Sequence, residues 1–256
     1  MKIIAKYHNV VVYEYEHEDE LAKAVGDQII TLVNSHDEHC LIGLTPWMIP
    51  SSIFTYLIQD HQINKTNYKN VKFFHVDELV LSEDKYQHVV NFTDQLKINL
   101  FDYINYKNKN IYYPSEHSGD HEYSRYDRTI WQLGCLDLVI LNIGNHGELG
   151  LNNPTNSNIN SLTHVIRLSN DNLAQLKKEQ QLKKEQLPEY AITMGIRSIF
   201  GAKRIILIAN DIETGKIIKE VLNNNYEKPC SLSMLINHHD VSIYVDRSAG
   251  KEIRNL

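Results

Sequence analysis

The residues Leu136–Pro154, LDLVILNIGNHGELGLNNP, decide the fold class. The near-continuous apolar run Leu136–Ile143 predicts a strand that is covered on both faces, as in a parallel sheet. Three glycines then allow the chain to turn tightly, and His146 and Glu148 stand between them. Because open α/β sheets bind their ligands at the carboxyl ends of strands, this loop is a candidate site.

Strand-like and helix-like patterns alternate along most of the chain, which has 256 residues. The expected strands are Val10–Tyr15, Cys40–Leu44, Val71–His75, Leu136–Ile143, Thr163–Leu168, Arg204–Ala209 and Val241–Val245. The expected helices are Asp19–Asn34, Ser51–Gln62, Asn91–Tyr106, Glu189–Phe200 and Ile212–Asn223. This alternation predicts an α/β fold with a single doubly wound, mostly parallel sheet flanked by helices, in one domain over residues 1–256.

Two segments depart from this alternation. Lys107–His121 is polar and is expected to be an irregular surface excursion. Leu176–Gln186 contains LKKEQ twice, which predicts a solvated helical extension with local charge pairs. A partner-binding element and a mobile lid are the alternatives for this repeat.

Charge and cysteine usage indicate a soluble cytoplasmic protein. A formal net charge of -6 gives no electrostatic case for binding nucleic acid or an anionic membrane. The sequence contains neither a membrane-length apolar run nor a signal-peptide pattern at its start. The cysteines Cys40, Cys135 and Cys230 are widely spaced and odd in number, which favours buried thiols over disulfides or a zinc site.

Two early motifs follow strands. Gly43-Leu44-Thr45-Pro46 offers main-chain amides and a hydroxyl that suit a phosphate, although an ordinary strand-to-helix turn explains the same residues. Asp77-Glu78 follows VKFFHV and either holds a general base or caps a loop. Adjacent carboxylates can raise one another's pKa, which suits a base that acts near neutral pH.

Two later motifs also carry titratable groups. His146 and Glu148 could form an imidazole–carboxylate pair that moves protons, or they could be ordinary polar residues of a loop. Lys216 follows the strand RIILIA in TGKIIKEVL, where it is either a surface lysine or a counter-charge for a phosphate.

The order of these motifs carries a resemblance that no single motif does. LIGLTP, FFHVDEL, NIGNHGELGLNNP, PEYAITMGI and TGKI follow one another in this chain. Together they resemble the glucosamine-6-phosphate deaminase (isomerase) family, whose close relatives are the 6-phosphogluconolactonases. The resemblance runs from about Glu18 to Asp246, and PEYAITMGI matches the deaminase branch better than the lactonase branch.

The resemblance implies an activity and a set of roles. Members of the deaminase branch open the ring of an amino-sugar 6-phosphate, isomerise aldose to ketose and release ammonia, without a metal or an organic cofactor. Asp77 matches the carboxylate that moves the proton between sugar carbons. The stretch Gly43–Thr45, with Leu44 between, matches part of the phosphate loop, and Lys216 matches the phosphate-binding lysine. The family's habits also make a homo-oligomer plausible.

The ring-opening loop departs from the family pattern. The family reads Gly-x-Asp-Gly-His and then Glu-Pro, whereas His146, Glu148 and Asn153 occupy the Asp, His and Glu positions here. In addition, His164 stands about where a phosphate-binding arginine is expected. Three interpretations follow: an enzyme in which His146 and Glu148 form a transposed acid–base pair, a non-catalytic sugar-phosphate-binding protein, or a lactonase-like hydrolase. The first is our prediction, with Asp77, His146 and Glu148 as catalytic residues.

Overall fold

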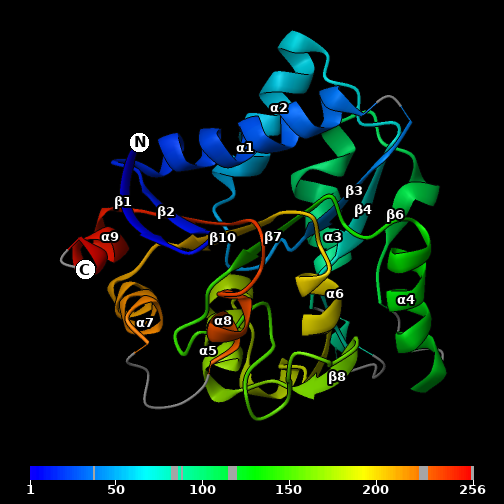
Figure 1. Ribbon diagram of the computed structural model, residues 1–256. Coiled ribbons are helices and arrows are strands. Elements are labelled where there is room, and N and C mark those ends of the chain that lie inside the picture. The colour runs from blue at the N-terminus through cyan, green and yellow to red at the C-terminus, as the bar shows by residue number, and fades with distance from the viewer. Residues whose placement is uncertain (37, 82–85, 88, 115–119, 225–229, 255–256) are drawn as a thin grey trace.

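A computed structural model describes residues 1–36, 38–81, 86–87, 89–114, 120–224 and 230–254, without the side chains of residues 120–124. Its centre is a sheet with the strand order β1-β2-β11-β10-β7-β3-β4-β6 (Figure 1). These strands are β1 (Lys2–Tyr7), β2 (Val10–Glu14), β3 (Cys40–Leu44), β4 (Val71–His75), β6 (Ile111–Tyr112), β7 (Leu138–Asn142), β10 (Ile205–Ala209) and β11 (Val241–Val245). All neighbours are parallel except β1 and β2, so the predicted mostly parallel sheet is confirmed.

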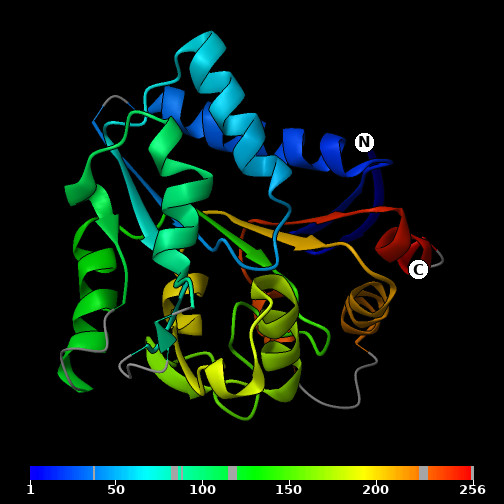
Figure 2. The same ribbon diagram turned by 180° about the vertical axis from the view of Figure 1, so that it is seen from behind.

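Helices cover both faces of this sheet (Figures 1 and 2). One face carries α1 (Glu18–Ser35), α2 (Ser52–Asn64) and α3 (Phe92–Asn99). The other face carries α4 (Asp120–Gln132), α6 (Ile196–Phe200), α7 (Ile212–Leu222), α8 (Ser231–Leu235) and α9 (Arg247–Ile253). Side chains of β7 alternate between the two cores: Ile140 packs with α1 and α2, and Val139 and Leu141 pack on the other side. Burial on both faces explains the continuous apolar run of this strand.

A second sheet, not predicted from the sequence, joins β5 (Asp77–Leu79), β9 (Tyr190–Thr193) and β8 (His164–Arg167) in antiparallel fashion. It shares a third apolar cluster with α5 (Asn170–Gln180), in which Trp47 and Leu176 are buried. Val76 is the single residue between β4 of the large sheet and β5 of the small one. Its N–H donates to Leu44 O of β3, and its carbonyl accepts from the N–H of Met194, the residue that follows β9.

The predicted helix Glu189–Phe200 is wrong in its first half, where the chain forms β9. Tyr190–Thr193 pairs with both β5 and β8, and this pairing outweighs the helical spacing of its apolar residues. The helix α6 begins only after Gly195, whose position leaves no room for a side chain, because a Cβ there would lie 2.1 Å from Ser161 O.

Other expectations need smaller corrections. The segment predicted as Asn91–Tyr106 is helical only to Asn99, followed by a 3-10 turn over Phe101–Tyr103. The expected excursion Lys107–His121 contains β6 and the start of α4, a helix that the sequence analysis missed, and its residues 115–119 lie outside the described part of the chain. The LKKEQ repeat divides between α5 and a 3-10 turn at Lys184–Gln186. No helix in the described residues is long and apolar enough to cross a bilayer.

Candidate active site

Asp77 lies at the junction of the two sheets, just past the carboxyl end of β4. Only 1% of its surface is exposed. Its Oδ1 accepts a hydrogen bond of 2.7 Å from Thr193 Oγ1, which is its register partner across β5 and β9. The carboxylate is therefore held in a fixed position, at the end of the sheet where the ligands of such folds bind.

Burial raises the pKa of Asp77 from the ordinary value of 3.8 to about 7. The hydroxyls of Thr193 and Thr45 and the N–H of Leu151 stabilise the ionised form and oppose this effect, and the adjacent Glu78 adds slightly to the increase. The sequence predicts a raised pKa from the neighbouring carboxylate, whereas loss of hydration is the main cause in the structure. A carboxyl group with a pKa near 7 can both accept and return a proton at neutral pH.

Both carboxylate oxygens of Glu78 accept hydrogen bonds from the start of α3. Its Oε1 accepts from Phe92 N–H at 2.8 Å, and its Oε2 accepts from Thr93 N–H at 2.9 Å and from Thr93 Oγ1. These donors belong to the first turn of α3, so Glu78 satisfies the amino end of that helix. Of the acidic pair, Asp77 is the member available for chemistry.

The candidate phosphate loop lies partly inside β3. Leu44 is its last residue, with its side chain in the core, and a Cβ on Gly43 would lie 2.7 Å from Val139 Cγ2. Gly43 thus permits close packing of β3 on β7. Thr45 is buried beside Asp77, and its Oγ1 accepts from Trp47 N–H at 3.2 Å. The helix α2 begins only at Ser52, so Thr45 does not stand at a helix start.

The loop that follows β7 closes over Asp77 through Gly150. Gly150 has φ +57, and a Cβ on it would lie 3.0 Å from Asp77 Oδ1. Gly147, with φ +75, packs equally closely on Cys230, since a Cβ there would lie 2.8 Å from Cys230 Sγ. Both positions need a left-handed conformation and lack space for a side chain, so they require glycine.

His146 and Glu148 lie in the same loop but do not form the expected pair. Glu148 Oε2 accepts from the main-chain N–H of His146 at 2.9 Å. The imidazole points to α5 instead, with Nε2 3.2 Å from Asp171 Oδ2, and both of these side chains are about 70% exposed. The expected imidazole–carboxylate pair exists with a different carboxylate, one that follows His146 by 25 positions.

A hollow of about 70 Å³ separates this loop from α5. His146, Glu148 and Gly150 border it on one side, and Asp171 and Gln175 border it on the other. Gly150 therefore borders the hollow and also packs on Asp77. The loop after β7 thus carries His146 at the surface and contacts the buried Asp77 beneath it.

The other predicted phosphate ligands are less close to this hollow. Lys216 lies on α7 with 47% of its side chain exposed, and its Nζ pairs with Glu213 Oε1 at 2.7 Å. The next residue, Ile217, contacts the loop at Gly147. His164 pairs with Thr193 across β8 and β9, its Nδ1 lies 2.7 Å from Leu162 O, and its buried Nε2 has no partner.

The main residue that the sequence analysis missed is Thr193. It donates to Asp77 and accepts from Asn152 Nδ2 at 3.1 Å, and Asn152 also donates to Leu149 O and Met194 O. This chain of hydrogen bonds ties the loop to the small sheet. Thr193 lies within PEYAITMGI, a motif that the sequence analysis used only for the family resemblance. Asn153 accepts from Thr155 N–H and Oγ1 and stabilises the local turn.

Comparisons with known proteins identify the family of this chain. Residues 16–243 match the family described as glucosamine-6-phosphate isomerases/6-phosphogluconolactonase. A glucosamine-6-phosphate deaminase of Bacillus pumilus is 31% identical, with 93% of this chain and 98% of that protein aligned. One of Mycoplasma mycoides is 30% identical, with 94% and 96% aligned.

Solved structures place the fold in the same group. A monomeric glucosamine-6-phosphate deaminase superposes with a TM-score of 0.82 at 25% identity, covering 94% of this chain and 99% of that one. A 6-phosphogluconolactonase from Thermotoga maritima gives a TM-score of 0.68 at 16% identity, covering 93% and 100%, which shows a shared fold. The chain therefore belongs to the family of glucosamine-6-phosphate isomerases and 6-phosphogluconolactonases.

Proposed function

We propose that this protein is a glucosamine-6-phosphate deaminase that converts an amino-sugar 6-phosphate to a ketose phosphate and releases ammonia. The observation that carries the proposal is Asp77, a buried carboxyl group with a pKa of about 7 at the carboxyl end of β4. Family membership and the deaminase relatives supply the substrate class.

The reaction needs a base that first takes a proton and then returns it to the adjacent carbon. In the open-chain aldose, ionised Asp77 removes the proton from C2 and delivers it to C1. The resulting imine at C2 adds water and loses ammonia, which leaves the ketose. Because the pKa of Asp77 is near the working pH, both transfers avoid a large uphill step.

His146 assists ring opening in this proposal, with Asp171 of α5 holding its imidazole. Glu148 fixes the loop through the main chain of His146. The phosphate is bound by Thr45 and the main chain of Gly43 and Leu44, together with Lys216 after its release from Glu213. These assignments rest on the resemblance and on the contacts of His146, Glu148 and Asp171 described above.

The segment α5 is proposed to act as the lid of the site. A hollow of about 70 Å³ is far smaller than the few hundred Å³ of a usual small-molecule site, so α5 must move for a hexose phosphate to enter. Side chains of α5 make two polar contacts near the site: His146 with Asp171, and Trp47 Nε1 donating to Glu179 Oε2 at 2.8 Å. Farther along, Gln180 bonds to both main-chain groups of Val90, and Leu176 is buried in the third apolar cluster. The contact of His146 with Asp171 is solvent-exposed and weak, which suits an element that opens.

The test is a coupled ammonia-release assay with glucosamine-6-phosphate, alongside binding titrations with hexose phosphates. Wild type is expected to release ammonia, and Asp77→Asn is expected to bind substrate without turnover. Asp60→Asn is the matched control, because Asp60 is a buried carboxylate on α2 away from the site, and it should retain activity.

Two results would contradict the proposal. Binding of sugar phosphates without any turnover by wild type would identify a non-catalytic binding protein. Hydrolysis of a phosphogluconolactone without ammonia release would identify a lactonase. We further propose that the protein acts in the cytoplasm as a single domain and forms a homo-oligomer. Sedimentation of the purified protein tests the oligomeric state.

A further inference from the structure

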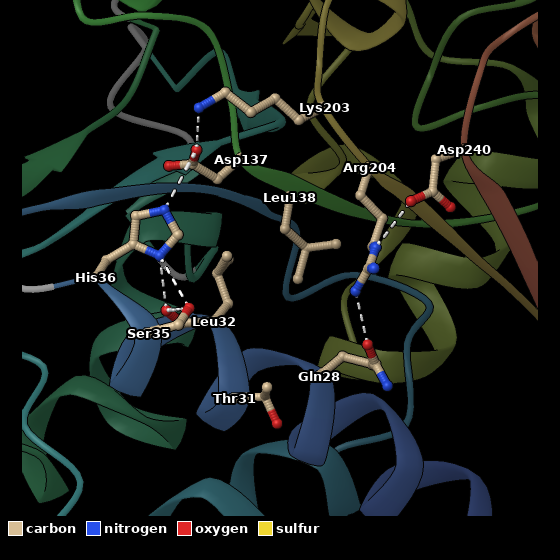
Figure 3. A pocket seen from close by; sticks show the side chains of 10 residues that line it. All are labelled: Gln28, Thr31, Leu32, Ser35, His36, Asp137, Leu138, Lys203, Arg204 and Asp240. Atoms are coloured by element: carbon tan, nitrogen blue, oxygen red, sulfur yellow. Dashed lines mark hydrogen bonds and ion pairs between the residues drawn. The ribbon is translucent and has the colours of Figure 1, made fainter.

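A larger hollow, of about 370 Å³, lies at the opposite end of the large sheet from Asp77. One wall is the second half of α1 and its carboxyl end (Figure 3). The other wall consists of residues that stand just before β7, β10 and β11, among them Asp137, Arg204 and Asp240. We call this hollow the amino-end pocket, because the parallel strands begin there.

Two ion pairs hold opposite sides of the amino-end pocket. Lys203 Nζ lies 2.6 Å from Asp137 Oδ1 on one side. On the other side, Arg204 Nε lies 3.1 Å from Asp240 Oδ2, and Arg204 NH1 donates to Gln28 Oε1 at 2.7 Å. Apart from His36, the formal charges of the described lining residues therefore cancel.

Asp137 fixes the depth of the pocket. Its side chain is only 5% exposed, and its Oδ2 accepts from Leu41 N–H at 2.8 Å. His36 Nε2 approaches Oδ1 to 3.8 Å, and His36 Nδ1 lies 2.9 Å from Leu32 O. These contacts connect His36, which follows α1, and Leu41 of β3 to Asp137, which precedes β7.

The remaining lining combines apolar and hydroxyl groups. The half-buried Leu32 and the exposed Thr31 line the pocket from α1, and the almost wholly buried Leu138 lies at its floor (Figure 3). Figure 3 draws no interaction from the Thr31 hydroxyl to the other residues shown. An apolar patch with donors and acceptors on both sides fits a ring that carries hydroxyls on its edge and C–H groups on its face.

Charge excludes other small ligands of similar size. An anion would meet the negative end of the α1 dipole and two cations that are already paired. A cation would have to compete with Lys203 and Arg204 for the carboxylates of Asp137 and Asp240, which are already paired. A neutral hydroxylated molecule leaves both ion pairs intact and avoids the cost of unpairing a partly buried charge.

We propose that the amino-end pocket binds a neutral, hydroxyl-rich ligand of about one monosaccharide in size. The pocket volume falls in the usual range for small-molecule sites, about 300–1,000 Å³. The site is separate from the one that contains Asp77, and the proposal does not depend on the deaminase activity.

Calorimetric titration with glucose, galactose and mannitol tests the proposal. At least one of these probes is expected to bind with a Kd of about 1 mM or tighter. Thr31 is exposed, so the indole of Thr31→Trp can occupy the pocket without disturbing the core. The ligand would then lose most of its contact with the pocket walls, and its binding should weaken at least about tenfold. Thr55→Trp, at an exposed position of α2, is the matched control and should bind as wild type does.

Three outcomes would overturn the proposal. These are no saturable binding of any neutral probe at millimolar concentration, equal binding by Thr31→Trp and wild type, or displacement of the probe by inorganic phosphate. Circular dichroism of both tryptophan variants verifies that they are folded. Ammonia release by Thr31→Trp should equal that of wild type, and absence of ammonia release in both proteins would bear on the proposed function alone.

Discussion

Removing the Thr193 hydroxyl should move the pH profile of the reaction to higher pH. Thr193 Oγ1 donates to Asp77 Oδ1 at 2.7 Å and stabilises the ionised carboxylate. A hydrogen bond to a charged group contributes about 1.5–3 kcal/mol, and about 1.4 kcal/mol corresponds to one pKa unit. The variant Thr193→Val is therefore expected to raise the pKa of Asp77 from about 7 by roughly one to two units.

The consequence for rate depends on pH. If the pKa rises by one unit, the ionised fraction of Asp77 at pH 7 falls from about one half to about one tenth. The value of kcat/KM at pH 7 should then fall roughly fivefold, while the plateau at high pH should stay close to that of wild type. The assay is ammonia release measured across the pH range on both sides of neutrality.

A conservative variant separates this effect from simple structural damage. Thr193→Ser keeps the hydroxyl, so the midpoint of its pH profile for kcat/KM should equal that of wild type. The hydroxyl also accepts from Asn152 Nδ2, so Thr193→Val is expected to lower stability as well. A uniform loss of rate at all pH values, with an unchanged acid midpoint, would refute the reasoning.

Three further predictions concern the same site. Asp77→Asn should raise the Tm more at pH 8 than at pH 5. The pKa of the Asp77 carboxyl group is about 7 in the folded state and 3.8 ordinarily, so the folded protein loses on the order of 4 kcal/mol of stability as pH rises from about 4 to about 7. Equal Tm shifts at the two pH values would contradict this. His146→Gln should lower kcat at least about tenfold with little change in Tm, and Asp171→Asn should lower it less, since their pair is exposed; wild-type kinetics in His146→Gln would remove that residue from the mechanism. Gly150→Ala should abolish most ammonia release, because the added methyl group would press on Asp77. Gly134→Ala is the control: Gly134 also has a positive φ but has open space around it, so this variant should lose only about 1 kcal/mol of stability in thermal unfolding and keep its activity.

The large sheet could be predicted because its strands carry a simple signal. Cys40–Leu44 and Val71–His75 were predicted with the bounds that the structure has. Cys40–Leu44 is buried along its whole length, and this burial on both faces explains its continuous apolar run. The strand Tyr190–Thr193 could not be recognised, because a short apolar run fits helix and strand equally well and only pairing with β5 and β8 decides between them.

For the candidate site, the sequence indicates which residues to consider but not which residues they contact. The position of Asp77 followed from the end of a strand, but its main pKa effect comes from depth below the surface, which a sequence does not display. The partner of His146 is Asp171 on α5, and local spacing pointed to Glu148 because that residue is only two positions away. Contacts between segments that are distant in the chain depend on tertiary packing, so spacing alone could not reveal them.

The single residue Val76 between the two sheets has a consequence for how activity is lost on heating. Asp77 and its hydrogen-bond donor Thr193 face each other on β5 and β9 of the small sheet, and Val76 alone joins β5 to β4 of the large sheet. A local opening of the small sheet would separate donor from carboxylate while the eight-stranded sheet remained folded. The thermal limit of catalysis is then set by the free energy of that partial opening, which is smaller than the free energy of unfolding the whole chain.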